Sequence, residues 1–241
     1  MTAVETRNVT KEYEGAGQAA VRALRGVTLS VADGEFMALA GPSGSGKTTL
    51  LNLIGALDAP TTGTVRVAGR DLSGLSRREL ADLRRDRIGF IFQSYNLVPV
   101  LTAKENAEYV LQLQGVGPRD RTDRVADLFT RLGIGELLDS WPSKMSGGQQ
   151  QRVAVARAIA PMPAVVLADE PTANLDQAAG RSLVALMRTL NQERGITFVF
   201  STHDPMVLEQ ADRVVTLVDG RIAGDERRRR RRTPAARAEG A

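Results

Sequence analysis

Residues 41–48 read Gly-Pro-Ser-Gly-Ser-Gly-Lys-Thr and fit the pattern G-x-x-x-x-G-K-[ST] at every fixed position. The stretch follows a short β-rich run at 36–40 and opens a helical pattern that ends around Gly55. Glycines let a backbone curl so that its N–H groups point at phosphate oxygens, and a helix N-terminus adds partial positive charge. We therefore interpret the stretch as a phosphate-binding loop (P-loop) and not as a glycine-rich turn with an incidental lysine.

The motif assigns a role to each of its polar side chains. Lys47 would reach the β- and γ-phosphates and stabilise their charge during the reaction, and the Thr48 hydroxyl would bind Mg²⁺. The residues expected to hold the nucleotide are Gly41, Ser43, Gly44, Ser45, Gly46, Lys47, Thr48 and Thr49.

A second motif lies more than a hundred residues further on. The apolar run 165–168 ends in Asp169 and Glu170, and such a continuous run is typical of a strand buried on both faces of a parallel sheet. Two carboxylates at a strand end could simply begin a solvated loop, but beside a P-loop they favour Mg²⁺ binding by Asp169 and polarisation of the attacking water by Glu170. These features predict a P-loop NTPase.

The order of elements indicates an α/β fold. The strands are expected at 27–31, 36–40, 64–67, 88–92, 165–168, 197–200 and 214–218, and Ala-Asp-Gly between the first two predicts a hairpin-type connection. The helices are expected at 46–55, between 67 and 88, at 102–114, 119–132, from Gly148 to about Ala160, at 177–194 and after Pro205. This alternation favours a mostly parallel sheet covered by helices, with 94–145 as an inserted helical subdomain.

Composition excludes several other classes of protein. The chain has no cysteine, which rules out disulfides, thiolate zinc sites and a cysteine nucleophile, and one histidine makes metal clusters improbable. No run reaches the ~18 apolar residues of a membrane span and no signal-peptide pattern begins the chain, so it reads as cytoplasmic.

Charge is concentrated at the C-terminus. Residues 227–241 hold seven arginines, six of them consecutive at Arg227 to Arg232, against one glutamate, which leaves a net charge of about −2 for residues 1–226. We expect a disordered tail after a 1–226 domain, with contact to anionic lipid or nucleic acid by the arginines as the alternative. The folded body is not basic, so no specific nucleic-acid face is expected.

Residues 145–152 indicate which kind of P-loop NTPase the chain is. Met145-Ser146-Gly147-Gly148-Gln149 closely resembles the LSGGQ signature of the ATP-binding-cassette (ABC) family, with methionine in place of the usual leucine. Ser146 and the glycines open a second helix N-terminus, and one chain cannot easily aim both N-termini at the same phosphate. The resemblance therefore implies a head-to-tail pair in which Ser146, Gly147, Gly148 and Gln149 of each copy contact the ATP of the other.

Further marks of the family lie before and after the signature. Gln93 matches the glutamine that contacts Mg²⁺, takes part in catalysis and senses the transporter side, and Asp176 in Asn-Leu-Asp matches the loop that crosses the dimer interface. His203 in Ser-Thr-His-Asp matches the catalytic histidine near the γ-phosphate, although a lone histidine is by default a surface residue. Tyr13 resembles the aromatic residue that stacks on adenine, although it could merely cover an edge strand.

Within the family the chain looks like the lipoprotein-release and macrolide-export group. The resemblance implies an ABC-type P-loop NTPase fold with a mixed, mostly parallel sheet core, an antiparallel β subdomain and an inserted helical subdomain. It also implies a transport-coupled, Mg²⁺-dependent ATPase that forms a homodimer around two ATP and drives a permease from the cytoplasmic face of the membrane. The alternative is a related ATPase that controls cell-wall hydrolysis through a division-type permease; a soluble DNA-repair or translation protein is disfavoured because this chain holds one cassette and no coiled coil.

Overall fold

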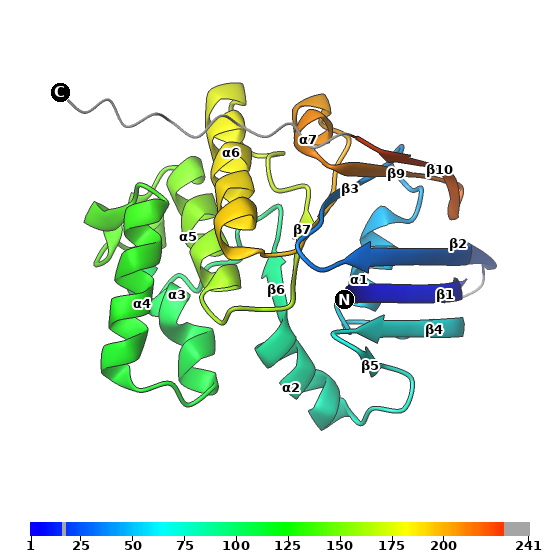
Figure 1. Ribbon diagram of the computed structural model, residues 1–241, viewed down its shortest axis with the longest axis horizontal. Coiled ribbons are helices and arrows are strands. Elements are labelled where there is room, and N and C mark those ends of the chain that lie inside the picture. The colour runs from blue at the N-terminus through cyan, green and yellow to red at the C-terminus, as the bar shows by residue number, and fades with distance from the viewer. Residues whose placement is uncertain (16–17, 229–241) are drawn as a thin grey trace.

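The computed structural model describes residues 1–15 and 18–228, and two sheets organise this part of the chain (Figure 1). One is a four-stranded antiparallel sheet of order β2-β1-β4-β5. Its strands are β1 (Thr2–Gly15), β2 (Gln18–Ala32), β4 (Thr62–Val67) and β5 (Arg70–Asp71).

The other sheet, six-stranded within the described residues, has the order β10-β9-β3-β8-β7-β6. Its strands are β3 (Phe36–Ala40), β6 (Ile88–Ile91), β7 (Val165–Asp169), β8 (Phe198–Ser201), β9 (Arg213–Val218) and β10 (Arg221–Arg227). All neighbours are parallel except β9 and β10. The predicted mixed, mostly parallel core with an antiparallel sheet beside it is confirmed.

The predicted hairpin between 27–31 and 36–40 is wrong. Strand β2 pairs with β1 in the antiparallel sheet, whereas β3 lies between β8 and β9 in the other. The turn at 33–35 carries the chain from one sheet to the other, and its Glu35 carboxylate accepts a hydrogen bond from the Ala32 N–H. A turn pattern is local and cannot specify which strands the segments on either side of it pair with. The partner of β2 is β1, and no strand was expected there from the sequence.

The helices lie close to the expected positions. They are α1 (Lys47–Ile54), α2 (Arg77–Arg87), α3 (Ala103–Leu113), α4 (Pro118–Arg131), α5 (Gly147–Ile159), α6 (Gln177–Arg194) and α7 (Pro205–Gln210). Region 94–145 holds α3, α4 and two short 3₁₀ turns, and α3 and α4 lie on the opposite side of the molecule from the antiparallel sheet (Figure 1). No helix in the described ranges is both long and apolar enough to span a bilayer.

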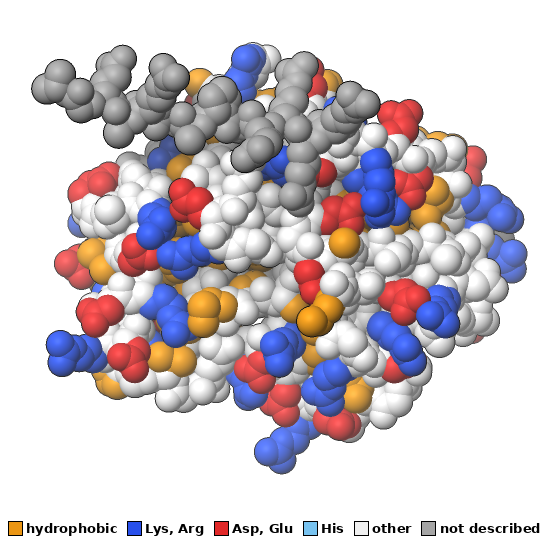
Figure 2. All heavy atoms as spheres, viewed as in Figure 1, with side chains coloured by type: hydrophobic (Ala, Val, Ile, Leu, Met, Phe, Trp, Pro, Cys, Tyr) orange, Lys and Arg blue, Asp and Glu red, His pale blue; other side chains and the backbone are white. Residues whose placement is uncertain are grey.

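The six-stranded sheet divides the core. Along β7, Val165 and Leu167 pack with α1 and the antiparallel sheet, whereas Val166 and Ala168 pack with α3 to α6. This alternation follows the two-residue period of a strand, and both faces are apolar because both are covered. Figure 2 shows acidic and basic side chains interspersed over the outer face that it presents.

The C-terminal tail is only partly described. Arg227 ends β10, and the Arg228 N–H donates to the carbonyl of Asp212. The remaining arginines of the predicted tail, 229–232, and its end at 241 lie outside the described residues.

Gly89→Ala is expected to destabilise the fold by about 1–3 kcal/mol, the usual cost of overpacking a core. A Cβ at Gly89 in β6 would lie 2.4 Å from the Ala158 carbonyl oxygen of α5, a backbone atom that cannot move aside alone. Urea denaturation would measure the change. Gly74→Ala is the matched control, because a Cβ there meets nothing within 4 Å; an equal loss of stability in both variants would contradict the packing argument.

Candidate active site

The predicted catalytic residues follow parallel strands that are neighbours in the sheet. The P-loop follows β3, Asp169 ends β7, His203 stands two residues after β8 and Gln93 two residues after β6. The order β3-β8-β7-β6 and its register, with Asp169 opposite Ser201, bring these strand ends to one edge. Ligands bind parallel α/β sheets at the carboxyl ends of the strands, so this edge is the candidate site.

Two glycines give the P-loop its shape. Gly41 has φ 143°, and a Cβ there would lie 2.1 Å from the carbonyl oxygen of Leu217. Gly46, the N-cap of α1, has φ 102°, and a Cβ there would lie 2.6 Å from the carbonyl oxygen of Ala23. Larger residues cannot occupy these positions without moving the neighbouring backbone. Gly46 also leaves the first N–H groups of α1 without a side-chain cap, as a phosphate-binding helix start requires.

The polar side chains of the loop fit an anionic ligand. Lys47 is 8% exposed, and its Nζ donates to the carbonyl oxygens of Gly41 (2.8 Å) and Pro42 (3.0 Å), so the ammonium lies across the loop. The Ser45 hydroxyl is buried and has no hydrogen-bond partner among the described residues. A buried hydroxyl without a hydrogen-bond partner destabilises the fold. A phosphate oxygen bound in the loop would accept a hydrogen bond from this hydroxyl. Ser43 and Gly44 are exposed on the same loop, and Thr49 belongs to the first turn of α1.

Two oxygen-bearing side chains fit a magnesium ion. The Thr48 hydroxyl donates to Asp169 Oδ1 over 3.2 Å. Mg²⁺ is usually bound through one or two carboxylates together with substrate phosphates and water, so a single carboxylate beside a hydroxyl suffices. Among the residues that the structure describes, no three acidic or histidine side chains form a complete protein cage for a metal. Gln93 is exposed at the same edge. Its main-chain carbonyl oxygen accepts a hydrogen bond from Asn174 Nδ2 over 2.9 Å.

Glu170 and His203 lie together. His203 Nδ1 and Glu170 Oε1 form a hydrogen bond of 2.9 Å, although the glutamate side chain is 18% exposed and the histidine 74%. Glu170 has φ 45°, an uncommon conformation for a non-glycine residue, and its N–H donates to the carbonyl of Ser201. The backbone bond holds Glu170 beside the end of β8, and the lone histidine of the chain contacts the carboxylate.

The signature motif, residues 145–149, lies at the start of α5 and not at the start of α1. Ser146 caps α5 in a capping box with Gln149, and a Cβ at Gly147 would lie 2.6 Å from the Tyr95 hydroxyl. Gly148 faces Ala179, whose N–H donates to Asp176, the N-cap of α6. No hydrogen bond or ion pair of the described residues joins residues 146–149 to the P-loop. The chain thus presents two separate helix N-termini.

Tyr13 extends from the β1–β2 hairpin. The hairpin reaches the P-loop at Ala23, next to Gly46. The Tyr13 hydroxyl donates to Asp58, and the ring is 40% exposed. The flat ring of Tyr13 is therefore exposed on the hairpin that touches the P-loop, where it could stack on a nucleotide base.

Three residues that the sequence analysis did not single out connect these parts. Gln151 of α5 is fully buried, and its Nε2 donates to the carbonyl oxygens of Pro171 (2.8 Å) and Phe92 (3.5 Å). The Thr172 hydroxyl donates to Asp204 Oδ2 over 3.0 Å, next to Glu170 and His203. A buried glutamine on an otherwise apolar helix face is the signal that could have indicated Gln151; the pair Thr172–Asp204 has no pattern in the sequence.

Comparison with known proteins agrees with this geometry. The family model described as "ABC transporter" matches residues 24–173. The chain is 49% identical to the lipoprotein-releasing system ATP-binding protein LolD of Anaeromyxobacter dehalogenans, over 94% of this chain and 95% of that protein. It is 46% identical to the macrolide export ATP-binding/permease protein MacB of Syntrophobacter fumaroxidans, over 92% of this chain but 31% of that protein. The chain thus spans about a third of the length of the macrolide export relatives that it matches.

Solved structures match closely as well. A dimeric structure of the ATP-binding cassette MJ0796 in a post-hydrolysis state with ADP and Pi aligns with a TM-score of 0.86 at 41% identity, over 94% of this chain and 99% of that one. A second dimeric structure of MJ0796 aligns with a TM-score of 0.87 at 40% identity. Family model, relatives and solved structures agree with one another, and the chain belongs to the ABC transporter family as an ATP-binding cassette ATPase.

Proposed function

We propose that two copies of the chain bind two ATP head to tail, hydrolyse them and thereby drive a membrane permease from the cytoplasmic side. The observation that carries the proposal is that each copy offers two helix N-termini, one at the P-loop and one at the signature, and no hydrogen bond or ion pair of the described residues joins them. A second copy would bring its signature to the first copy's nucleotide. The two MJ0796 structures, which are dimers, support this arrangement.

The chemistry proposed for the site follows from its contacts. Lys47, the Ser45 hydroxyl and the start of α1 bind the phosphates and stabilise their negative charge. Thr48 and Asp169 would hold Mg²⁺, which supplies further charge stabilisation when bound, and Gln93 would approach it from the end of β6. The Glu170 carboxylate orients the attacking water and accepts its proton, and His203 holds that carboxylate through the 2.9 Å bond. Ser146, Gly147, Gly148, Gln149 and Asp176 act on the nucleotide of the other copy.

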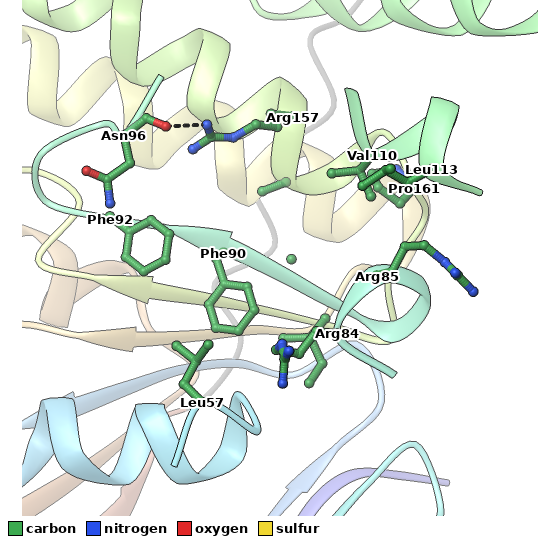
Figure 3. A pocket seen from close by; sticks show the side chains of 13 residues that line it. Leu57, Arg84, Arg85, Phe90, Phe92, Asn96, Val110, Leu113, Arg157 and Pro161 are labelled. Atoms are coloured by element: carbon green, nitrogen blue, oxygen red, sulfur yellow. Dashed lines mark hydrogen bonds between the residues drawn. The ribbon is translucent and has the colours of Figure 1, made fainter. Parts of the chain in front are cut away.

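A groove beside the site supports coupling to a permease. It encloses about 400 Å³ between β6, α3 and α5. Phe90 and Phe92 stack in parallel with ring centroids 5.7 Å apart, and Figure 3 shows them between Leu57 on one side and Asn96 with Arg157 on the other. Gln93 directly follows Phe92, so a cytoplasmic helix of the permease seated on these rings would press on the loop that leads to the nucleotide.

The relatives suggest a class of cargo. One relative is named for the release of lipoproteins and the other for the export of macrolides. We infer a permease that handles lipoproteins, lipids, drugs or peptides. Control of cell-wall hydrolysis through a division-type permease would use the same site residues, and the permease encoded beside this chain distinguishes the two. Contact of the arginine tail with anionic lipid stays the untested alternative to a solvated tail, because residues 229–241 lie outside the described residues.

The dimer is tested by light scattering of the Glu170→Gln chain with and without ATP and Mg²⁺. We expect a monomer without nucleotide and a dimer with it, because the blocked reaction retains the bound ATP. Adding Ser146→Asp should abolish the dimer: aspartate still caps α5, but its charge would face the partner's γ-phosphate.

Ser76→Asp, in the equivalent capping box of α2, is the matched control and should leave the dimer intact. A monomer under both conditions, with ATP bound, would contradict dimerisation by the chain alone. A dimer unaffected by Ser146→Asp would contradict the head-to-tail arrangement.

A further inference from the structure

Lys11 and Tyr13 lie near the end of the β1–β2 hairpin at which the two strands are joined, and Asp58, between α1 and β4, contacts both. Lys11 Nζ donates to Asp58 Oδ1 (2.6 Å) and to the carbonyl oxygen of Ala59 (2.9 Å). The Tyr13 hydroxyl donates to the other carboxylate oxygen, Asp58 Oδ2, over 3.0 Å. The Lys11 ammonium also lies 4.9 Å from the centroid of the Tyr13 ring, within the range of a cation–π contact. Asp58 therefore holds Lys11 and Tyr13 together through its two oxygens.

Asp58 is charged and well satisfied in this cluster. Burial by itself would raise the pKa of Asp58, but hydrogen bonds from Lys11, the Ala59 N–H and Tyr13 outweigh it and hold the pKa below its ordinary value. The Lys11 side chain is 13% exposed, which shields the pair from solvent more than an ordinary surface ion pair. The contacts therefore keep the tyrosine in one orientation.

The tyrosine that is held this way is exposed. Val21, opposite Tyr13 on β2 and on the same face of the hairpin, is also exposed. Ala23 two residues further along β2 touches the P-loop at Gly46, and two residues of strand span about 7 Å. The apolar surface made by Tyr13 and Val21 thus lies about 7 Å from the point at which β2 touches the P-loop, a distance that the ribose of a nucleotide could span.

We propose that Lys11 and Asp58 are positioning residues for the nucleotide base. They fix the Tyr13 ring in advance in the orientation that stacks on a flat base, so binding does not have to order the side chain. Lys11 covers part of the ring by its ammonium, and the remaining surface takes the base. The proposal rests on the ATP binding proposed above and on the expectation from the sequence that the Tyr13 ring stacks on adenine.

Calorimetric titration with ADP and with pyrophosphate, both with Mg²⁺, tests the proposal, because pyrophosphate offers phosphates but no base. Lys11→Met and Asp58→Asn should weaken ADP binding about 3- to 10-fold, the effect of one side chain no longer ordered in advance. Pyrophosphate binding should not change. Tyr13→Phe, which keeps the ring but not its tether, should behave like Asp58→Asn, and Tyr13→Ala should weaken ADP binding roughly 10- to 100-fold.

Two further variants sharpen the test. In Tyr13→Ala chains, Lys11→Met should cause no additional loss, because there is no ring left to position. Lys104→Met removes a lysine that pairs with Glu108 on α3, away from the hairpin, and should leave both affinities unchanged. Should Asp58→Asn fail to fold, Tyr13→Phe and Lys11→Met still decide the question.

The possible failures are distinct. Equal losses for ADP and pyrophosphate would mean that the cluster only stabilises the hairpin, which overturns the proposal. Unchanged ADP binding in Lys11→Met and Tyr13→Phe, with a large loss in Tyr13→Ala, would overturn the positioning role and leave the contact between Tyr13 and adenine intact. Unchanged ADP binding in Tyr13→Ala would refute that contact itself, and the positioning role with it.

Discussion

Glu170→Gln is expected to lower ATP turnover at least 100-fold while leaving ATP affinity within about twofold. General-base catalysis contributes roughly 10²- to 10⁴-fold, and the amide cannot accept the proton of the attacking water. The substitution keeps the shape of the side chain and a possible hydrogen bond to His203 Nδ1, so the P-loop contacts that hold the nucleotide are not disturbed.

Phosphate release at saturating ATP, together with equilibrium titration of ATP, would measure both quantities. Glu136→Gln, an exposed glutamate in the 3₁₀ turn Gly135–Leu137, is the matched control and should behave as wild type. Turnover within tenfold of wild type in Glu170→Gln would assign the base to another residue.

Lys47→Ala is expected to weaken ATP binding by about 100-fold or more. Hydrogen bonds to charged groups are worth about 1.5–3 kcal/mol each, and Lys47 carries up to three donors in a nearly buried position. Lys47→Arg should not restore affinity, because the planar guanidinium does not fit the space in which one ammonium reaches two loop carbonyls.

Equilibrium titration of ATP with each variant gives the comparison, and Lys104→Ala, at a half-buried lysine of α3 that pairs with Glu108, serves as the control. Unchanged affinity in Lys47→Ala would refute the assignment of residues 41–48 as the phosphate-binding loop. Rescue by arginine would show that only the charge at this position matters.

The candidate catalytic motifs can be recognised in the sequence because phosphate and Mg²⁺ binding need residues that are contiguous in sequence. Residues 41–46 form one loop that leads directly into α1 at Lys47, and the apolar run before Asp169 and Glu170 specifies a buried parallel strand that ends at the same edge of the sheet. The helices agreed with their expected bounds because capping residues such as Thr102, with Glu105 three residues later, determine where a helix starts.

The contacts between distant segments could not be predicted. Gln151 bonds Phe92 and Pro171, and Asp58 bonds Lys11 and Tyr13, across 20 to 59 residues of sequence. Such bonds depend on how two loops meet after the sheet has formed. The prediction of a hairpin at 33–35 was wrong for the same reason. Pairing of β2 with β1 buries Val27, Leu29 and Val31 against α1, and the sequence around the turn gives no information about the free energy of this distant contact.

The separation of the P-loop from the signature also has a genetic consequence. In a head-to-tail pair, each site takes its P-loop from one chain and its signature from the other. A cell that makes Lys47→Ala and Ser146→Asp chains together would therefore assemble mixed pairs with one intact site and one doubly defective site. Two inactive alleles would complement each other, which two lesions within a single self-contained site could never do.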